Sequence, residues 1–330
     1  MSPHGGLWSL IPGLGVKLAA SLVLLHASCL DHRRRLRRAP QFTYEHALLY
    51  GLADIANWSA EMASSSTFAA FDGGGYELQM GRWSRRLADP FLDFCGFADG
   101  EKVLDVGCGT GNLTFALAAR AKIKNVCGLD FSAAYVDYAQ HRNSDARVEF
   151  KVGDACALRF PDGSFDRTLS LLMLHFVPQA DKAIAEMRRV TRPGGVAGAA
   201  VWDMRGGYTG FRMFFDTAAV LDPGANQLRA NHLTRPMTRP GELAAAWRKC
   251  GFENVRAGTL TIRMEFTSFD DYWTPFVGTE GPSAQYVKSL SADHQDRLRD
   301  AVRQAYLDGE TDGARSYSAI AWAVRGTVLA

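Results

Sequence analysis

The residue pattern with the clearest chemical meaning is a run of three glycines at alternate positions. An acid precedes the run and an asparagine follows it, in the order Asp105, Gly107, Gly109, Gly111 and Asn112. Because glycine has no Cβ, such a turn lets a ligand lie directly against the backbone. A dinucleotide-binding turn would have its third glycine at position 112, and the acid would repel a pyrophosphate. The pattern therefore favours a ligand that carries positive charge and no phosphate.

Two further acids stand where they could hold a nucleoside. Asp130 ends an apolar segment, and its carboxylate could accept hydrogen bonds from ribose hydroxyls. Phe131 could lie against an adenine ring, and Ser132 could cap the helix that follows. Asp154 could accept from the adenine amine, while the amide of Ala155 could donate to the ring. Three acids at three successive strand ends together indicate S-adenosylmethionine, which carries an ammonium and a sulfonium but no phosphate.

Other side chains could complete such a site. Tyr76 and Arg82 are candidates to hold the carboxylate of the cofactor, because arginine binds carboxylates through two parallel hydrogen bonds. The alternative is a packing tyrosine and a surface arginine. Ser170 and Leu171 should reach the cofactor from the fourth strand. His175 follows that strand and is the candidate catalytic base, although a structural or substrate-packing role is favoured over base catalysis.

Short apolar runs that alternate with amphipathic segments predict an α/β sheet that would position these residues. The predicted strands are Val103–Val106, Val126–Asp130, Arg147–Val152, Arg167–Leu174, Val196–Trp202, Val255–Phe266 and Tyr317–Leu329. The main predicted helices are Met80–Phe94, Leu113–Arg120, Ala133–His141, Asp181–Thr191, Pro240–Cys250 and Ser291–Leu307.

Three stretches are less regular. Phe71–Tyr76 should be a flexible turn, and the helix after it should be interrupted near Pro90. The aromatic-rich segment 203–238 suits either a lid over a substrate or packing against the sheet. Residues 268–310 should be helical.

Composition is that of a soluble globular protein. The chain has 330 residues, of which 47% are hydrophobic and 22% are charged, and its net charge of +2 does not suggest a nucleic-acid binder. The six cysteines form no CxxC pair and no metal-site spacing. Reduced thiols in a cytoplasmic protein without a metal are therefore expected.

The N-terminal segment has a different composition. Leu18–Leu25 is apolar but too short to span a bilayer. A cluster of arginines follows it instead of preceding it, which is the wrong charge order for export. We expect residues 1–61 to be a poorly ordered extension, with membrane association unlikely, and residues 62–330 to form the functional domain.

Taken together, these motifs resemble the class I S-adenosylmethionine-dependent methyltransferases, and especially bacterial relatives of the ubiquinone/menaquinone-biosynthesis methyltransferases. The resemblance covers about residues 70–330, and it rests on Met80–Ser84, Asp105–Gly111, Leu129–Ser132, Gly153–Ala155, Phe160–Asp166, Arg192–Gly195 and Ala321–Gly326. It implies a Rossmann-like seven-stranded sheet of order 3-2-1-4-5-7-6, with strand 7 antiparallel and helices on both faces. The helical segment before the last strand would be an insertion.

The resemblance implies transfer of a methyl group to a small-molecule acceptor, with S-adenosylhomocysteine as the product. A general base helps only if the acceptor must lose a proton. The alternatives are a non-catalytic S-adenosylmethionine-binding protein and an NAD-dependent dehydrogenase, which Asp105 and the glycine spacing disfavour. No Asn/Asp-Pro-Pro-Tyr motif follows the fourth strand, which argues against methylation of adenine or glutamine amino groups. The acceptor and the oligomeric state stay open.

Overall fold

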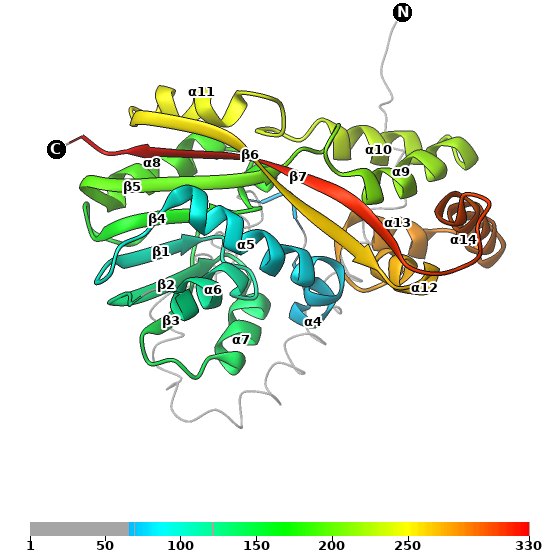
Figure 1. Ribbon diagram of the computed structural model, residues 1–330, viewed down its shortest axis with the longest axis horizontal. Coiled ribbons are helices and arrows are strands. Elements are labelled where there is room, and N and C mark those ends of the chain that lie inside the picture. Colours follow the sequence, from blue (N-terminus) through cyan, green and yellow to red (C-terminus); the bar gives the residue numbers. More distant parts are fainter. Residues whose placement is uncertain (1–65, 69, 121, 330) are drawn as a thin grey trace, which may run out of the picture. The chain divides into compact units, whose positions relative to one another are not determined.

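The structure is a computed structural model that describes residues 66–68, 70–120 and 122–329 (Figure 1). Its centre is a seven-stranded sheet of order β3-β2-β1-β4-β5-β7-β6. The first five strands pair in parallel, and β7 runs antiparallel to both β5 and β6. The expected fold class is therefore confirmed. The strands are β1 Lys102–Val106, β2 Asn125–Asp130, β3 Val148–Val152, β4 Phe165–Leu171, β5 Thr191–Trp202, β6 Glu253–Phe266 and β7 Arg315–Thr327.

Helices cover both faces of the sheet. Successive side chains of a strand point to opposite faces, so Val103 packs under α5, α6 and α7 while Leu104 and Val106 pack against α8 and α11. The helices are α4 Gly73–Tyr76, the π-helix η2 Glu77–Gly81, α5 Arg82–Cys95, α6 Asn112–Arg120, α7 Ala133–Arg142, the 3₁₀ turn η3 Leu174–Phe176, α8 Ala180–Val190, α9 Thr209–Leu221, α10 Ala225–Leu233, α11 Glu242–Lys249, α12 Phe269–Trp273, the 3₁₀ turn η4 Thr274–Phe276, α13 Gly281–Ser289 and α14 Ala292–Leu307.

The segment that precedes the sheet is more helical than expected. The predicted flexible turn is wrong over Gly73–Tyr76, which is helical, with Asp72 accepting from the amide of Gly74 at 2.9 Å. The predicted interruption at Pro90 is also wrong, because α5 continues through it. Burial of one apolar face of α5, which includes Leu87 and Phe91, offsets the hydrogen bond that the proline removes.

The fourth strand ends three residues earlier than predicted. Leu172 has a left-handed φ of 63°, which turns the chain out of the sheet, and η3 follows at once. His175 therefore lies in a buried 3₁₀ turn beyond the carboxyl end of the strand.

The expected helical insertion is present between β6 and β7. These two strands run past the end of β5 towards α12 and α14 (Figure 1). Helices α9 and α10 come from the aromatic-rich segment, and its expected role as a lid over a substrate stays a prediction. Phe214 packs against Phe276 with ring centroids 4.3 Å apart, while Phe211 and Phe215 line a cavity.

The predictions for residues 1–61 lie outside the described residues, so the expected domain boundary near residue 62 stays a prediction. Within the described ranges, none of the helices is both long enough and apolar enough to cross a membrane. Five cysteines in the described ranges are free thiols, namely Cys95, Cys108, Cys127, Cys156 and Cys250.

Candidate active site

The three glycines of the turn after β1 differ in what surrounds them. All three have left-handed φ angles, 74°, 55° and 87° for Gly107, Gly109 and Gly111. A Cβ on Gly107 would meet Met173 at 2.3 Å, and one on Gly111 would meet Phe150 at 2.8 Å. A Cβ on Gly109 would meet nothing closer than the Tyr76 ring at 3.9 Å. Only Gly109 therefore presents bare backbone to open space.

Asp130 ends β2 beside this turn and is 5% exposed. Its carboxylate accepts from the backbone amides of Gly109 at 2.8 Å and Ser132 at 2.9 Å. Burial raises the pKa of Asp130 to about 6, although these two hydrogen bonds favour the charged form. A carboxylate has about four lone-pair sites, so Asp130 can also accept a hydrogen bond from a ligand hydroxyl.

Asp105 is 1% exposed and lies behind the turn. Its Oδ2 accepts from Thr114 Oγ1 at 2.6 Å, whereas its Oδ1 has no partner among the described residues. Burial raises the pKa of Asp105 to about 7, and the nearby Asp130 adds to the rise. A buried carboxylate oxygen without a partner is costly, so this acid suits a site that receives positive charge.

The turn opens into a cavity at the carboxyl end of the sheet, with about 900 Å³ of empty space including its open mouth. Seven of the residues that the sequence predicted to form one site line this cavity, namely Tyr76, Gly107, Gly109, Asp130, Phe131, Leu171 and His175. A smaller pocket shares Gly107, Asp130 and Phe131 with it and is completed by Asp154 and Ala155. The structure thus places the two predicted nucleoside-binding strand ends at two adjacent pockets that share lining residues.

Several residues predicted to bind the cofactor do not line the cavity. Arg82 does not line the cavity, because its guanidinium pairs with Asp271 at 3.0 Å and lies 4.3 Å from the Trp83 ring. Ser132 caps α7 as predicted, accepting from the amide of Tyr135. Ser170 is buried, and its hydroxyl has no hydrogen-bond partner in the described ranges.

Asn112 belongs to a polar cluster centred on Glu77, which the sequence reasoning missed. Asn112 Nδ2 donates to Glu77 at 2.8 Å, Thr110 Oγ1 also donates to it, and Arg85 pairs with its other oxygen. These contacts hold the π-helix η2 against the glycine turn. Because Tyr76 directly precedes η2, the cluster positions that ring over Gly109. Sequence periodicity carries no signal for such a π-helix.

His175 is 1% exposed, and its ring lies against Phe176 with centroids 4.1 Å apart. Burial lowers its pKa well below the ordinary histidine value, and the positive charge of Arg235 lowers it further. The imidazole is therefore neutral at pH 7 and a weak base.

Comparison with known proteins gives the family. A family model described as "Methyltransferase domain" matches residues 103–195. Demethylmenaquinone methyltransferase of Lactobacillus johnsonii is 31% identical over 176 residues, which cover 49% of this chain and 72% of that protein. The chain belongs to the class I S-adenosylmethionine-dependent methyltransferases.

Other relatives of this chain match over shorter stretches. The fatty-acid O-methyltransferase of Mycolicibacterium smegmatis is 38% identical over 97 residues, 29% of this chain and 35% of that protein. The demethylmenaquinone methyltransferase of Renibacterium salmoninarum is 40% identical over 118 residues, 36% and 48% of the two chains. This chain thus spans between a third and a half of the length of these two relatives.

Among solved structures, phosphoethanolamine N-methyltransferase 2 of Haemonchus contortus is similar, with a TM-score of 0.50 and 17% identity over 78% of this chain and 56% of that one. At this identity the likeness concerns the fold alone.

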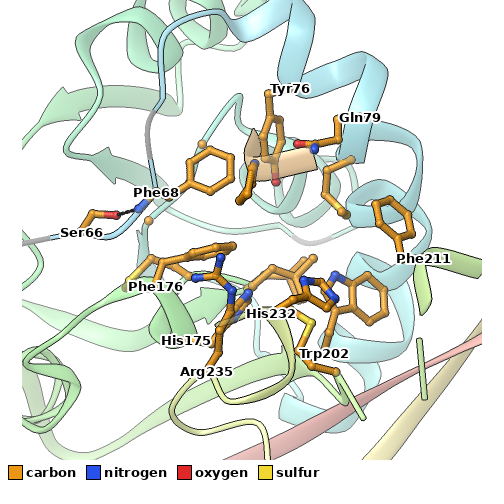
Figure 2. Close-up of a pocket in the computed structure, with 18 of the residues that line it drawn as sticks. Ser66, Phe68, Tyr76, Gln79, His175, Phe176, Trp202, Phe211, His232 and Arg235 are labelled. Carbon is orange, nitrogen blue, oxygen red and sulfur yellow. Dashed lines mark hydrogen bonds between the residues drawn. The ribbon is translucent and has the colours of Figure 1, made fainter. Parts of the chain in front are cut away.

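The aromatic and basic side of the cavity is the part that sequence reasoning largely missed. Figure 2 shows Tyr76 and Gln79 on one side of the hollow and His175, His232 and Arg235 on the other. The remaining wall is aromatic, and it consists of Phe68, Phe176, Trp202, Tyr208, Phe211 and Phe215. The one sequence signal for this wall was the high content of aromatic residues in the segment 203–238.

Proposed function

We propose that this protein binds S-adenosylmethionine in the cavity and transfers its methyl group to a small, largely apolar acceptor. The observation that carries the proposal is the continuity of two chemically different walls in one hollow. The glycine turn and Asp130 form one wall, and aromatic side chains form the other. When bound, S-adenosylmethionine supplies an activated methyl group.

The residues of the first wall fit that cofactor. Asp130 would accept from the ribose hydroxyls, and Asp154 and the amide of Ala155 would hold the adenine. The bare backbone at Gly109 would let the ligand approach closely. The unpartnered oxygen of Asp105 provides negative potential behind the turn for a cationic ligand.

The second wall would position the acceptor and exclude water. Alignment of the acceptor accounts for most of the rate when the methyl group is already activated, so residues that orient it matter more than a base. Trp202, Phe211 and Phe215 offer flat apolar surfaces for this purpose. The relatives named as acting on a fatty acid and on demethylmenaquinone support an acceptor with a large apolar body. A buried, neutral His175 would shape the pocket rather than remove a proton.

We further propose a cytoplasmic enzyme that uses no metal and binds no nucleic acid. The free thiols and the net charge of +2 support this view.

A thermal-shift panel with S-adenosylmethionine, S-adenosylhomocysteine, NAD and NADP tests the cofactor. A ligand at 100 times its dissociation constant adds about 2.7 kcal/mol to the free energy of unfolding, or roughly 5–10 °C. We expect this rise with the first two ligands only, and a comparable rise with NAD alone would refute the proposal. Methyl transfer to members of an acceptor library then separates an enzyme from a non-catalytic binding protein.

A further inference from the structure

A group of three basic side chains stands between the cavity and a neighbouring pocket. His175, His232 and Arg235, here called the basic cluster, line both hollows. His175 comes from η3, His232 from the last turn of α10, and Arg235 from the loop that follows α10. Figure 2 shows the three side chains gathered on one side of the hollow.

Each side chain of the basic cluster has one buried nitrogen atom without a hydrogen-bond partner among the described residues. In the part of the chain that the structure describes, His175 Nδ1, His232 Nε2 and Arg235 Nε are buried and form no hydrogen bond. The two histidines are 1% and 9% exposed. Arg235 makes one long side-chain hydrogen bond, from Nη1 to Thr67 Oγ1 at 3.4 Å, and its guanidinium lies 4.3 Å from the Phe176 ring centre.

No described acid neutralises this charge. Burial lowers the pKa of His232, and the negative charge of Asp216 acts in the opposite direction. That carboxylate already pairs with Arg212 at 2.8 Å and with Arg229. Burial lowers the pKa of Arg235 to about 10, so the guanidinium is still charged at pH 7. A buried charge without a counter-ion is costly, and a ligand anion would remove that cost.

Resting on the function proposed above, we propose that the acceptor is an apolar carboxylic acid and that Arg235 binds its carboxylate. A guanidinium matches a carboxylate through two parallel hydrogen bonds. The two neutral histidines can each donate one ring N–H to the same group. The apolar body of the acid would then lie against the aromatic wall, in which Phe176 contacts His175 and Arg235 and Phe215 stacks on His232.

The test compares an acid with its uncharged analogue on the protein saturated with S-adenosylhomocysteine. Decanoate and decanamide are titrated by calorimetry into the wild type and into Arg235→Gln, Arg235→Lys and Arg239→Gln. Arg239 is the matched control, because it is exposed, pairs with Glu242 and does not line the cavity. Ionic strength is held constant, since salt screens charge interactions.

We expect the wild type and Arg239→Gln to bind decanoate at least about tenfold more tightly than decanamide. Arg235→Gln should weaken decanoate binding about 10- to 100-fold and change decanamide binding less than about twofold. Arg235→Lys should restore part of the preference, because it keeps the charge but not the fork geometry.

Equal binding of acid and amide by the wild type, or binding of neither, would overturn the inference. A preference for decanoate that persists in Arg235→Gln would overturn it as well. In those cases binding of S-adenosylhomocysteine would still uphold the cofactor proposal, whereas a protein that does not bind S-adenosylhomocysteine would remove the basis of both.

Discussion

The two walls of the cavity are built in opposite ways. The proposed cofactor half consists of Gly107, Gly109, Asp130, Asp154 and Ala155, which all lie between residues 107 and 155, and the Asp130 carboxylate accepts a hydrogen bond from the amide of Gly109. The proposed acceptor half consists of the aromatic wall and the basic cluster, drawn from residues 68 to 235. In it, His175 Nδ1, His232 Nε2 and Arg235 Nε form no hydrogen bond with the described residues. A strand-end turn can thus be prepared by residues close together in the sequence, whereas the aromatic and basic wall needs elements that are distant along the chain.

The largest effect should arise at Gly109 in the cofactor half. Gly109→Ala places a methyl group in the open space where the ligand would approach the backbone. We therefore expect affinity for S-adenosylhomocysteine to fall more than about 100-fold. The free energy of unfolding should fall only about 1–2 kcal/mol, the cost of a left-handed alanine. Calorimetry and denaturant unfolding measure the two effects.

Gly111→Ala is the matched control, because its Cβ would meet Phe115 and Phe150 at 2.8 Å instead of open space. It should lose about 2–5 kcal/mol of stability from left-handed strain and overpacking. If both variants lost stability equally and kept their affinity, Gly109 would be a packing residue.

The next largest effect is expected for Asp130→Ala. Loss of a charged acceptor for the ribose hydroxyls should weaken binding of S-adenosylhomocysteine by about 1.5–3 kcal/mol. Asp162→Ala, an exposed acid outside the cavity, is a suitable control. Unchanged affinity in Asp130→Ala, measured by calorimetry, would place the ribose contact elsewhere.

Affinity for S-adenosylhomocysteine should also depend on pH. Burial raises the pKa of Asp130 to about 6 and that of Asp105 to about 7, so each carboxyl takes up a proton as the pH falls through its value. The neutral form accepts more weakly from hydroxyl and ammonium groups. Affinity should therefore be highest above pH 7 and fall up to about tenfold per pH unit for each proton that must leave.

Calorimetry from about pH 8 to about pH 5 measures this dependence. Asp105→Asn should remove the part of the change that occurs near pH 7, where Asp105 titrates. A flat profile in the wild type would show that neither carboxyl must be charged for binding.

The smallest effect should follow a change in the acceptor half. His175→Asn should retain most of the methyl-transfer rate, because a buried, neutral histidine shapes the pocket without taking a proton. Its pKa lies well below the usual value, so the wild-type rate should show no step near pH 6.5 that this variant removes. A rate at least about 100-fold lower in the variant would instead mark His175 as a general base.

Prediction from sequence succeeded where structure is local. The alternation of apolar and amphipathic segments predicted the strands, whereas their order was implied by the family resemblance. The glycine turn and Asp130 lie at the carboxyl end of the sheet, where the sequence placed them, and their role in cofactor binding stays a prediction. Pro90 and the end of β4 were predicted wrongly, because burial of α5 and the left-handed Leu172 override local propensity. Arg82 illustrates the same limit, since its partner Asp271 is distant in the sequence.

The sequence by itself determined the sheet, the glycine turn and the acids beside it, because backbone periodicity and a missing Cβ act over a few neighbouring residues. Only the tertiary structure decided which side chains line the proposed acceptor half together with His175. Phe68, His175, Trp202 and Arg235 carry no shared periodicity, and they meet because η3, α10 and the end of β5 pack around one hollow. Whether Arg235 has a counter-charge depends on that packing, since Coulomb interactions follow distance in space and not separation along the chain.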